Sequence, residues 1–187
     1  MKIWDTIVNR ISFHAVYDEN IIDALYGFDM LKEPSHLEIV DFLYSEAKMA
    51  IEKQLEICMA HLKEEELPNS AILGLIDVEV YAKKFDFPPP GKTTGAVHDN
   101  LCIKFPTKGI ITLGIGPDFI VLRSRRVIIN FPNMIKELQK KLPSAGIEGG
   151  GHEVVGSIKF IEGMQKEVIM ELKNSLGICS LEKSQSK

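Results

Sequence analysis

Residues 146–160 read GIEGGGHEVVGSIKF and carry the strongest local signal in this chain of 187 residues. Three consecutive glycines, Gly149, Gly150 and Gly151, come directly before His152. In the interior of a helix or strand each glycine costs about 0.5–1 kcal/mol relative to alanine, so we expect this run to lie outside regular elements. Bare backbone there would offer N–H donors to an anion such as phosphate. A plain surface loop is the alternative interpretation.

Outward from this run, helical and strand patterns alternate. Helices are expected over residues 20–31, 35–66, 93–105, 131–142 and 163–176, and strands over 71–81, 109–115, 119–122 with an extension at 127–129, and 157–161. This alternation predicts an α/β fold with a mixed sheet flanked by helices, preceded by a helical N-terminal extension. We expect a helical extension or connector over residues 1–70, an α/β domain over 71–179 and a polar tail over 180–187.

The long helix before the α/β domain has a clear start signal. Ser35 and Glu38 have the spacing of a capping box, and Pro68 follows the charged run 63–66 that we expect to end the helix. Apolar residues between Leu37 and Leu62 form one stripe at helical spacing. The stripe is interpreted either as packing onto the chain's own core or as a face that binds a protein partner.

Three motifs together resemble one known family. The segment GGGHEVVGSIKF resembles the GGGH signature of the C-terminal, DHH-associated domain in the RecJ-like branch of the DHH phosphoesterase superfamily. Residues 93–97, TTGAV, resemble that family's Thr-x-x-Gly-x-Val entry to a helix. Residues 122–125, LRSR, resemble its Val-Ser-x-Arg strand, although Arg123 stands where the family has serine. The resemblance covers roughly residues 72–177.

This resemblance implies a set of binding residues. In the family, the GGGH residues contact the phosphate or base of the substrate, which implies a site for nucleic acid or phosphate at Gly149, Gly150, Gly151 and His152, joined by Arg123, Ser124 and Arg125. Arginine also suits bidentate phosphate contact on chemical grounds. The alternative for the arginines is a charged edge strand protected from aggregation. Ser124 has no neighbouring His or Asp in sequence to activate it, so nucleophilic catalysis is not supported.

The sequence does not show the groups that metal-dependent hydrolysis requires. The five histidines are scattered singly, and the Asp-His-His triplet of the family's catalytic half is missing. Two-metal catalysis needs convergent oxygen ligands, so we expect no catalytic residues, no metal and no small-molecule cofactor, and therefore no enzyme. The three cysteines form no CxxC pair, and no apolar stretch approaches the length of a membrane span, which indicates a cytoplasmic protein without a membrane partner.

Charge and resemblance together suggest a binding protein. The net charge of −4 differs from the basic balance usual for an autonomous nucleic-acid binder. The chain is similar to a stand-alone archaeal branch of the RecJ-like family that associates with GINS, which implies a non-catalytic subunit of the DNA-replication complex of GINS and the MCM helicase, with possible contact to single-stranded DNA. The alternatives are the substrate-binding subunit of a split DHH-type phosphoesterase or exonuclease, and an autonomous single-strand binder.

Overall fold

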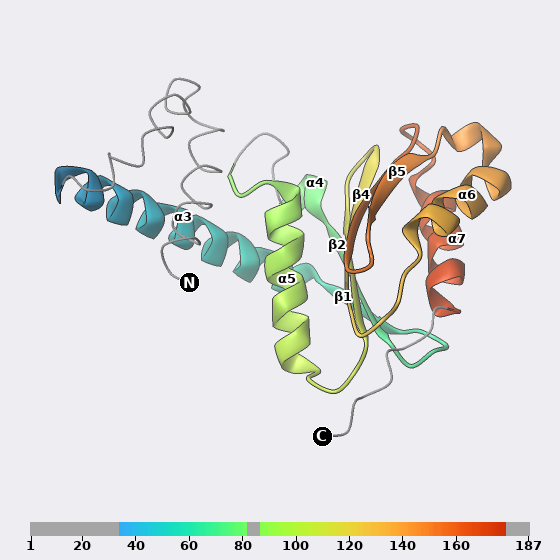
Figure 1. Cartoon of the computed structure of the whole chain (residues 1–187), viewed down its shortest axis with the longest axis horizontal. Helices are drawn as coiled ribbons and strands as arrows, with labels where there is room; N and C mark the ends of the chain where they lie inside the picture. The colour runs from blue at the N-terminus through green and yellow to red at the C-terminus, as the bar shows by residue number, and fades with distance from the viewer. Residues whose placement is uncertain (1–33, 82–86, 179–187) are drawn as a thin grey trace.

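A computed structural model describes residues 34–81 and 87–178 of the chain (Figure 1). The helix expected over residues 20–31 and the polar tail over 180–187 lie outside the described residues, as do the side chains of the expected capping box. The elements are, in chain order, α3 (Pro34–His61), β1 (Lys63–Glu66), β2 (Ile72–Asp77), α4 (Val78–Tyr81), α5 (Pro90–Lys104), β3 (Ile110–Ile115), β4 (Phe119–Arg125), α6 (Phe131–Lys141), the 3-10 turn η2 (Pro143–Ala145), β5 (Glu148–His152), β6 (Val155–Lys159) and α7 (Gln165–Gly177).

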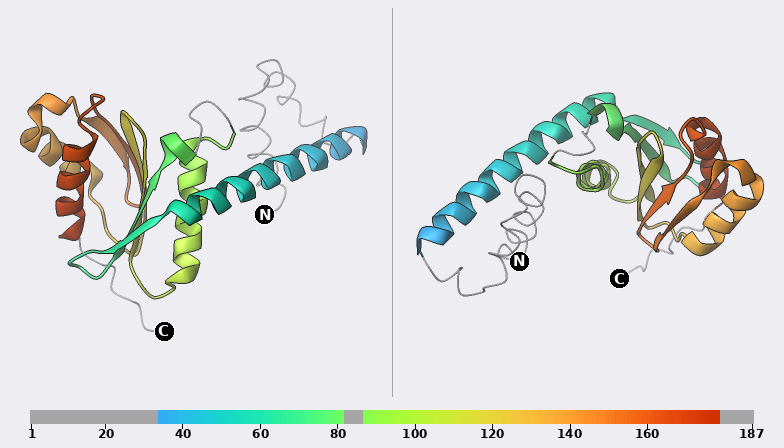
Figure 2. Two further views of the ribbon diagram at one scale, coloured as in Figure 1. Left: turned by 180° about the vertical axis from the view of Figure 1, so that it is seen from behind. Right: turned by 90° about the horizontal axis from the view of Figure 1, so that it is seen from above.

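The expected mixed sheet flanked by helices is confirmed. Six strands lie in the order β1-β2-β3-β4-β6-β5, and only β2 and β3 run parallel among the described strands. Helix α5 connects these two strands, as a parallel pair requires. Figure 1 shows α5 on one side of the sheet and α6 and α7 on the other. Figure 2 shows that α3 continues well past the sheet.

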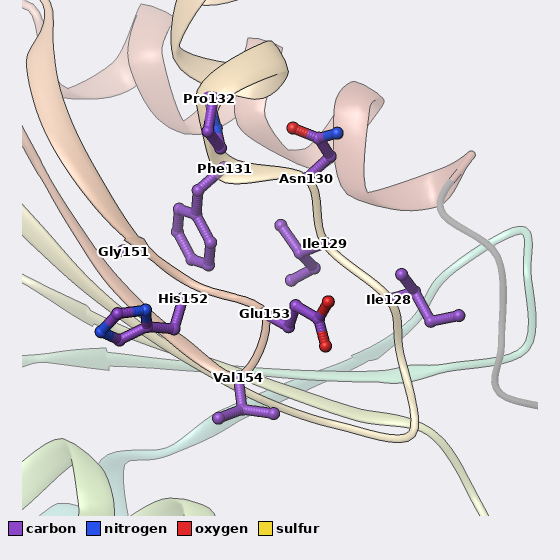
Figure 3. Close-up of a pocket in the computed structure, with 9 residues that line it drawn as sticks. All are labelled: Ile128, Ile129, Asn130, Phe131, Pro132, Gly151, His152, Glu153 and Val154. Carbon is purple, nitrogen blue, oxygen red and sulfur yellow. The ribbon is translucent and has the colours of Figure 1, made fainter.

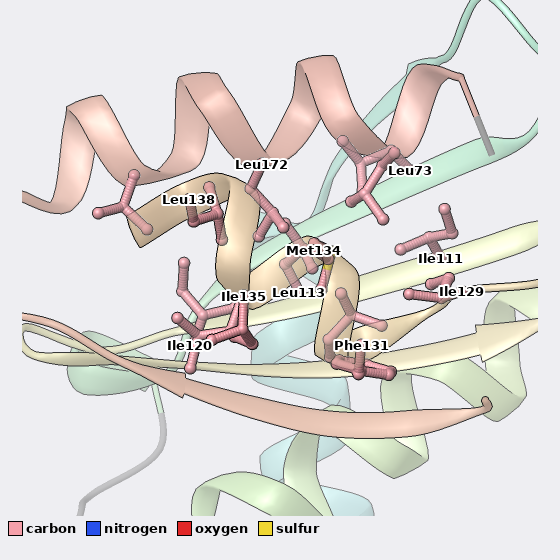
Figure 4. Close-up of a cluster of buried hydrophobic side chains, with 14 of the residues drawn as sticks. Leu73, Ile111, Leu113, Ile120, Ile129, Phe131, Met134, Ile135, Leu138 and Leu172 are labelled. Carbon is pink, nitrogen blue, oxygen red and sulfur yellow. The ribbon is translucent and has the colours of Figure 1, made fainter. Parts of the chain in front are cut away.

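The larger core lies between the sheet and the pair α6 and α7 (Figure 4). Every second residue of β4, such as Ile120 and Leu122, is buried on this face, because successive side chains of a strand point to opposite sides. Phe131, Leu138 and Leu172 cover them from the helices. The amphipathic helix expected at 131–142 is confirmed, with Asn130 Oδ1 accepting a hydrogen bond from the Asn133 amide as its N-terminal cap.

A smaller core lies on the opposite face, beneath α3 and α5. It contains Cys58 of α3 together with Val97 and Leu101 of α5 and Ile76 and Ile110 of the sheet. Glycines allow the close approach of helix and sheet here: a Cβ atom on Gly114 would lie 2.0 Å from Thr94 Oγ1. The C-terminal half of the apolar stripe on α3 therefore packs onto the chain's own core.

The expected end of the long helix is wrong. Residues 63–66 form the edge strand β1 instead of the last helical turn, and β1 pairs with β2. Each of its three glutamates lies near one lysine: Glu64 Oε1 is 2.8 Å from Lys104 Nζ, Glu65 Oε2 is 2.6 Å from Lys173 Nζ, and Glu66 Oε1 is 2.7 Å from Lys108 Nζ. These pairs place charge along an edge that would otherwise invite further pairing. The sheet thus begins before residue 70.

The strand expected over residues 71–81 is shorter than predicted. It ends at Asp77, whose Oδ1 accepts hydrogen bonds from the backbone amides of Glu79 and Val80. This carboxylate caps the short helix α4, so the chain turns at Asp77 despite the β-branched residues that follow. The later extension at 127–129 is also not part of a strand. Arg126 adopts a left-handed conformation with φ of 59°, which ends β4.

Two further expectations near the motifs are corrected. Thr93 and Thr94 do not begin a helix, because α5 already starts at Pro90, and Thr94 Oγ1 donates to the Pro90 carbonyl from inside the first turns. The glycine run is not outside regular structure either, since it forms the middle of β5. Within the described residues, no helix is both long enough and apolar enough to cross a membrane.

Candidate nucleic-acid interface

The three glycines of β5 have two different explanations. A Cβ atom on Gly149 would lie 2.3 Å from the Ser157 carbonyl oxygen, and one on Gly151 would lie 2.3 Å from the Val155 carbonyl oxygen. These two positions must be glycine for β5 to pair with β6. A Cβ atom on Gly150 would meet nothing within 4 Å. The fold therefore accounts for the outer glycines, whereas Gly150 leaves open backbone on an exposed strand.

Strand register brings two of the expected site residues into one row. Arg123 of β4 is opposite Val155 of β6, and Val155 is in turn opposite His152 of β5. Neighbouring strands lie about 4.8 Å apart, so the Cα atoms of Arg123 and His152 are roughly 10 Å apart on the same face. Gly150 lies on this face too, because it is two residues before His152.

This face is open where β6 and β5 extend beyond α5. On it, the β6 residues Ser157 and Lys159 are exposed and Val155 is half-buried, and the β5 residues Glu148, Gly150 and His152 are all exposed. Among the described elements, α5 covers β2, β3 and β4 on this side, and the helix that packs on β5 is α6 from the other side. We call the set Arg123, Gly150, His152, Ser157 and Lys159 the open row.

Arg123 lies at the border between α5 and the rest of the open row. Its guanidinium rests over Gly95, where a Cβ atom would come within 3.8 Å of Nη2, and Nη2 donates to the Gly91 carbonyl at 3.4 Å. Its Nε is buried and has no hydrogen-bond partner among the described residues. A guanidinium has five N–H donors, and the hydrogen bond from Nη2 uses one of them. The buried Nε is not accessible to a ligand, so any contact with an anion would come from the terminal nitrogens.

The other two expected strand residues are placed elsewhere. Arg125 donates from Nη1 to the Cys102 carbonyl at 3.3 Å and from Nη2 to the Pro106 carbonyl at 3.4 Å, so it binds the C-terminal end of α5. Ser124 points to the opposite face, is buried, and donates from Oγ to the Val127 carbonyl at 2.8 Å. The structure thus brings Arg123, Gly150 and His152 together and leaves Ser124 outside the row.

Sequence reasoning missed Ser157 and Lys159. The period of two along residues 155–159, VGSIK, places Val155, Ser157 and Lys159 on one face and buries Gly156 and Ile158 on the other. That alternation was available in the sequence once the strand was extended back to Val155. Gly156 is small because Phe131 lies beneath it, where a Cβ atom would come within 2.1 Å of the ring.

A pocket of about 610 Å³ adjoins the open row at the tip of the β5–β6 hairpin (Figure 3). One wall comes from the hairpin and the other from the segment between β4 and α6. Figure 3 shows Glu153 beside Ile129, whereas the imidazole of His152 points away from Phe131, to the other side of its strand. The Ser124 amide donates to the Val154 carbonyl at 2.9 Å and so fixes the hairpin tip against β4.

A buried polar cluster supports the helix beside Arg123. His98 Nδ1 and Thr112 Oγ1 are 2.9 Å apart, and His98 Nε2 and Cys102 Sγ are 3.5 Å apart. Burial lowers the pKa of His98 to about 4; Asp99 opposes this shift, and Arg123 and Arg125 add to it. His98 is therefore neutral at physiological pH and serves to hold α5 on β3. Burial also raises the pKa of the Cys102 thiol.

Metal-binding chemistry is not apparent in the described ranges 34–81 and 87–178. These residues contain no group of three or more His, Cys, Asp or Glu side chains arranged to hold a metal ion. Cys58 and Cys102 are free and buried. The open row instead combines two cationic side chains, a histidine and bare backbone, with the carboxylate of Glu148 opposite Lys159 on the same face.

The chain has a curated relative of similar sequence. The chain is 40% identical over 157 residues to the uncharacterized protein MJ1198 of Methanocaldococcus jannaschii, covering 81% of this chain and 21% of that protein. The chain thus spans about a fifth of the length of this curated relative. No family model matches the chain.

Two solved structures have the same fold as this chain. A DHH domain described as a member of the s1p family of ribosomal proteins matches with a TM-score of 0.78 and 35% identity, over 95% of this chain and 42% of that one. RecJ of Thermus thermophilus in complex with Mn²⁺ matches with a TM-score of 0.56 and 12% identity, over 93% of this chain and 24% of that one. The sheet that carries the open row therefore has a fold shared with the DHH domain and with RecJ.

Proposed function

We propose that this chain is a nucleic-acid-recognition module whose binding surface is the open row. The observation that carries the proposal is the register that aligns Arg123, at the border of α5, with Val155 and His152 on the face that is open at β6 and β5. Arg123 supplies a guanidinium, Lys159 adds a second cation opposite Glu148, and Gly150 lets a ligand approach the backbone. Such a surface suits the phosphates of a single strand.

At a finer level, we propose a non-catalytic role in a cytoplasmic DNA-replication complex, with GINS as the partner and the MCM helicase reached through it. The resemblance of the GGGH, TTGAV and LRSR motifs to a GINS-associated branch of the RecJ-like family supports this role, and so does the net charge of −4, which suits a scaffold subunit. Co-purification with GINS tests it. Because the open row is expected to face nucleic acid, His152→Ala should retain GINS, and failure of the wild-type chain to bind GINS would contradict this role.

A second candidate is the substrate-binding part of a DHH-type phosphoesterase or exonuclease. The shared fold with a RecJ solved in complex with Mn²⁺ favours it. Incubation with single-stranded DNA and Mn²⁺ separates the candidates. The non-catalytic role predicts no cleavage product from this chain alone. Product that appears only after a metal-bearing partner is added would favour the phosphoesterase.

The main proposal is tested by titrating a labelled single strand at fixed salt and following fluorescence anisotropy. Gly150→Val places a side chain into open space, so it should leave the fold intact and block approach to the backbone. We expect its affinity to fall about tenfold or more, given that one lost contact of about 1.4 kcal/mol changes an equilibrium constant by that factor. Lys140→Ala, on an exposed lysine of α6 paired with Glu137, is the matched control and should bind as wild type.

Two outcomes would contradict the main proposal. One is the absence of binding by the wild-type chain even at low salt, where phosphate contacts are strongest. The other is unchanged affinity of Gly150→Val together with an unchanged melting temperature, since the substituted side chain would then stand on a surface that no ligand approaches.

A further inference from the structure

The pocket at the hairpin tip has an apolar mouth that the fold does not explain. Ile128 on the segment between β4 and α6 is 50% exposed, and Val154 on the β5–β6 turn is 53% exposed. Both line the pocket (Figure 3). Large aliphatic side chains on two separate segments are thus kept at the rim of one cavity. A cavity of about 610 Å³ lies within the usual range for small-molecule sites, and apolar walls are typical of them.

The charge of the pocket excludes phosphate as its occupant. Its lining contains the carboxylate of Glu153 and no lysine or arginine. A carboxylate repels phosphate and accepts hydrogen bonds from N–H groups, including those on the edges of nucleobases. The Oδ1 atom of Asn130 is engaged as the cap of α6 and is not a free acceptor. The lining therefore favours a flat, largely apolar group that carries N–H donors.

The pocket and the open row lie on opposite faces of the sheet and meet at the tip of the β5–β6 hairpin. His152 belongs to both, since it lines the pocket and lies in the row with Arg123. The bond from the Ser124 amide to the Val154 carbonyl keeps this junction in place. A single strand whose phosphates lie along the open row would reach the pocket by passing around the exposed hairpin tip at residues 152–154.

We propose that this pocket takes one base of the bound single strand, with the exposed side chains of Ile128 and Val154 against it and Glu153 accepting from its N–H edge. The inference rests on the proposed function. The phosphates of the strand would contact the open row, and one of its bases would occupy the pocket. Affinity for a single strand should therefore depend on its bases as well as on its phosphates.

The test compares two oligonucleotides of equal length and charge. One carries normal bases, and the other carries abasic nucleotides in their place. With wild-type protein we expect the normal strand to bind roughly tenfold more tightly, in line with the contribution of a single base contact. Ile128→Asp should remove most of this difference and leave affinity for the abasic strand within about twofold, because its contacts are phosphate contacts. Ile161→Asp, at an isoleucine that is 56% exposed outside the pocket, is the matched control.

Each outcome decides between the two proposals. Failure of wild-type protein to bind either strand at low salt would overturn the proposed function and the pocket assignment together. Equal binding of both strands would overturn the pocket assignment alone, and so would an equal loss in the Ile128 and Ile161 variants. Val154→Asp, from the opposite rim, repeats the test if Ile128→Asp does not fold, and an unchanged base dependence in it would also overturn the assignment.

Discussion

The face of the sheet beneath α6 and α7 buries almost only aliphatic and aromatic groups, whereas the face beneath α3 and α5 also buries Thr94, His98 and Thr112. Ser124 is the buried polar side chain of the first face, and it is satisfied by the Val127 carbonyl. Apolar packing tolerates many side-chain combinations, while a buried hydrogen bond fixes distance and direction. We call the face beneath α6 and α7 the apolar face and the face beneath α3 and α5 the polar face. The two faces constrain the molecule in different ways.

The polar face is also the one that carries the open row. The His98–Thr112 contact fixes α5 on β3, and α5 in turn supplies the glycine surface on which the Arg123 guanidinium rests. The apolar face holds the larger buried cluster, and the polar face sets the position of the candidate ligand-binding group. Substitutions on the two faces should differ accordingly.

The largest effect is expected from adjacent residues of β4 on opposite faces. Leu122 is fully buried beneath α6 and α7, so Leu122→Ala should lower the free energy of unfolding by about 2–5 kcal/mol. Val121 is half-buried on the open side, and Val121→Ala should cost less than about 1 kcal/mol. Chemical denaturation of both variants measures the difference. Similar losses would show that the two faces contribute equally.

The sequence alone predicted most of the apolar face. Period-two burial in β4, the amphipathic pattern of α6 and the α/β alternation all follow from local patterns of apolar residues. The edge strand β1 could not be predicted in the same way. Its sequence KEEE has little strand propensity, and it pairs because Lys104, Lys108 and Lys173 from distant segments neutralise its glutamates.

An intermediate effect is expected from the buried hydrogen bond of the polar face. Thr112→Val keeps the shape of the side chain but leaves His98 Nδ1 without its partner 2.9 Å away, which should cost about 1–3 kcal/mol. Thr112→Ser retains the hydroxyl and should recover most of that loss. Thermal or chemical denaturation provides the measurement. If valine proved as stable as threonine, the contact would not be holding α5.

The candidate site was only partly predictable, because it too depends on contacts between segments that are distant in the sequence. Sequence reasoning selected Gly150, His152 and Arg123 from motifs, but pairing and burial decide which of the selected residues meet. Arg125 is one alternation step from Arg123 and shares its face, yet it contacts the end of α5 through two backbone carbonyls. That Arg125 binds a ligand remains a prediction. Nucleic acid would have to compete for this guanidinium with the two backbone carbonyls at the end of α5.

The smallest effect is expected in the pH dependence of the free energy of unfolding, and it comes from His98 on the polar face. Burial depresses the pKa of His98 from 6.5 to about 4 in the folded chain. Between these values the unfolded chain binds more protons than the folded chain, so the free energy of unfolding rises with pH across this window. Stability from this group is thus present above pH 6.5 and lost progressively as pH falls towards 4.

His98→Gln tests this account because it removes the titrating group from the same position. The free energy of unfolding should fall less steeply between pH 6.5 and 4 in this variant than in the wild-type chain, even if its value at about pH 7 is lower. Carboxylates that do not interact with His98 contribute equally to both proteins, so the difference in slope reports His98 together with its interaction with Asp99. Parallel curves would mean that His98 takes up its proton as readily in the folded chain as in the unfolded one, and that α5 tolerates an imidazolium against β3.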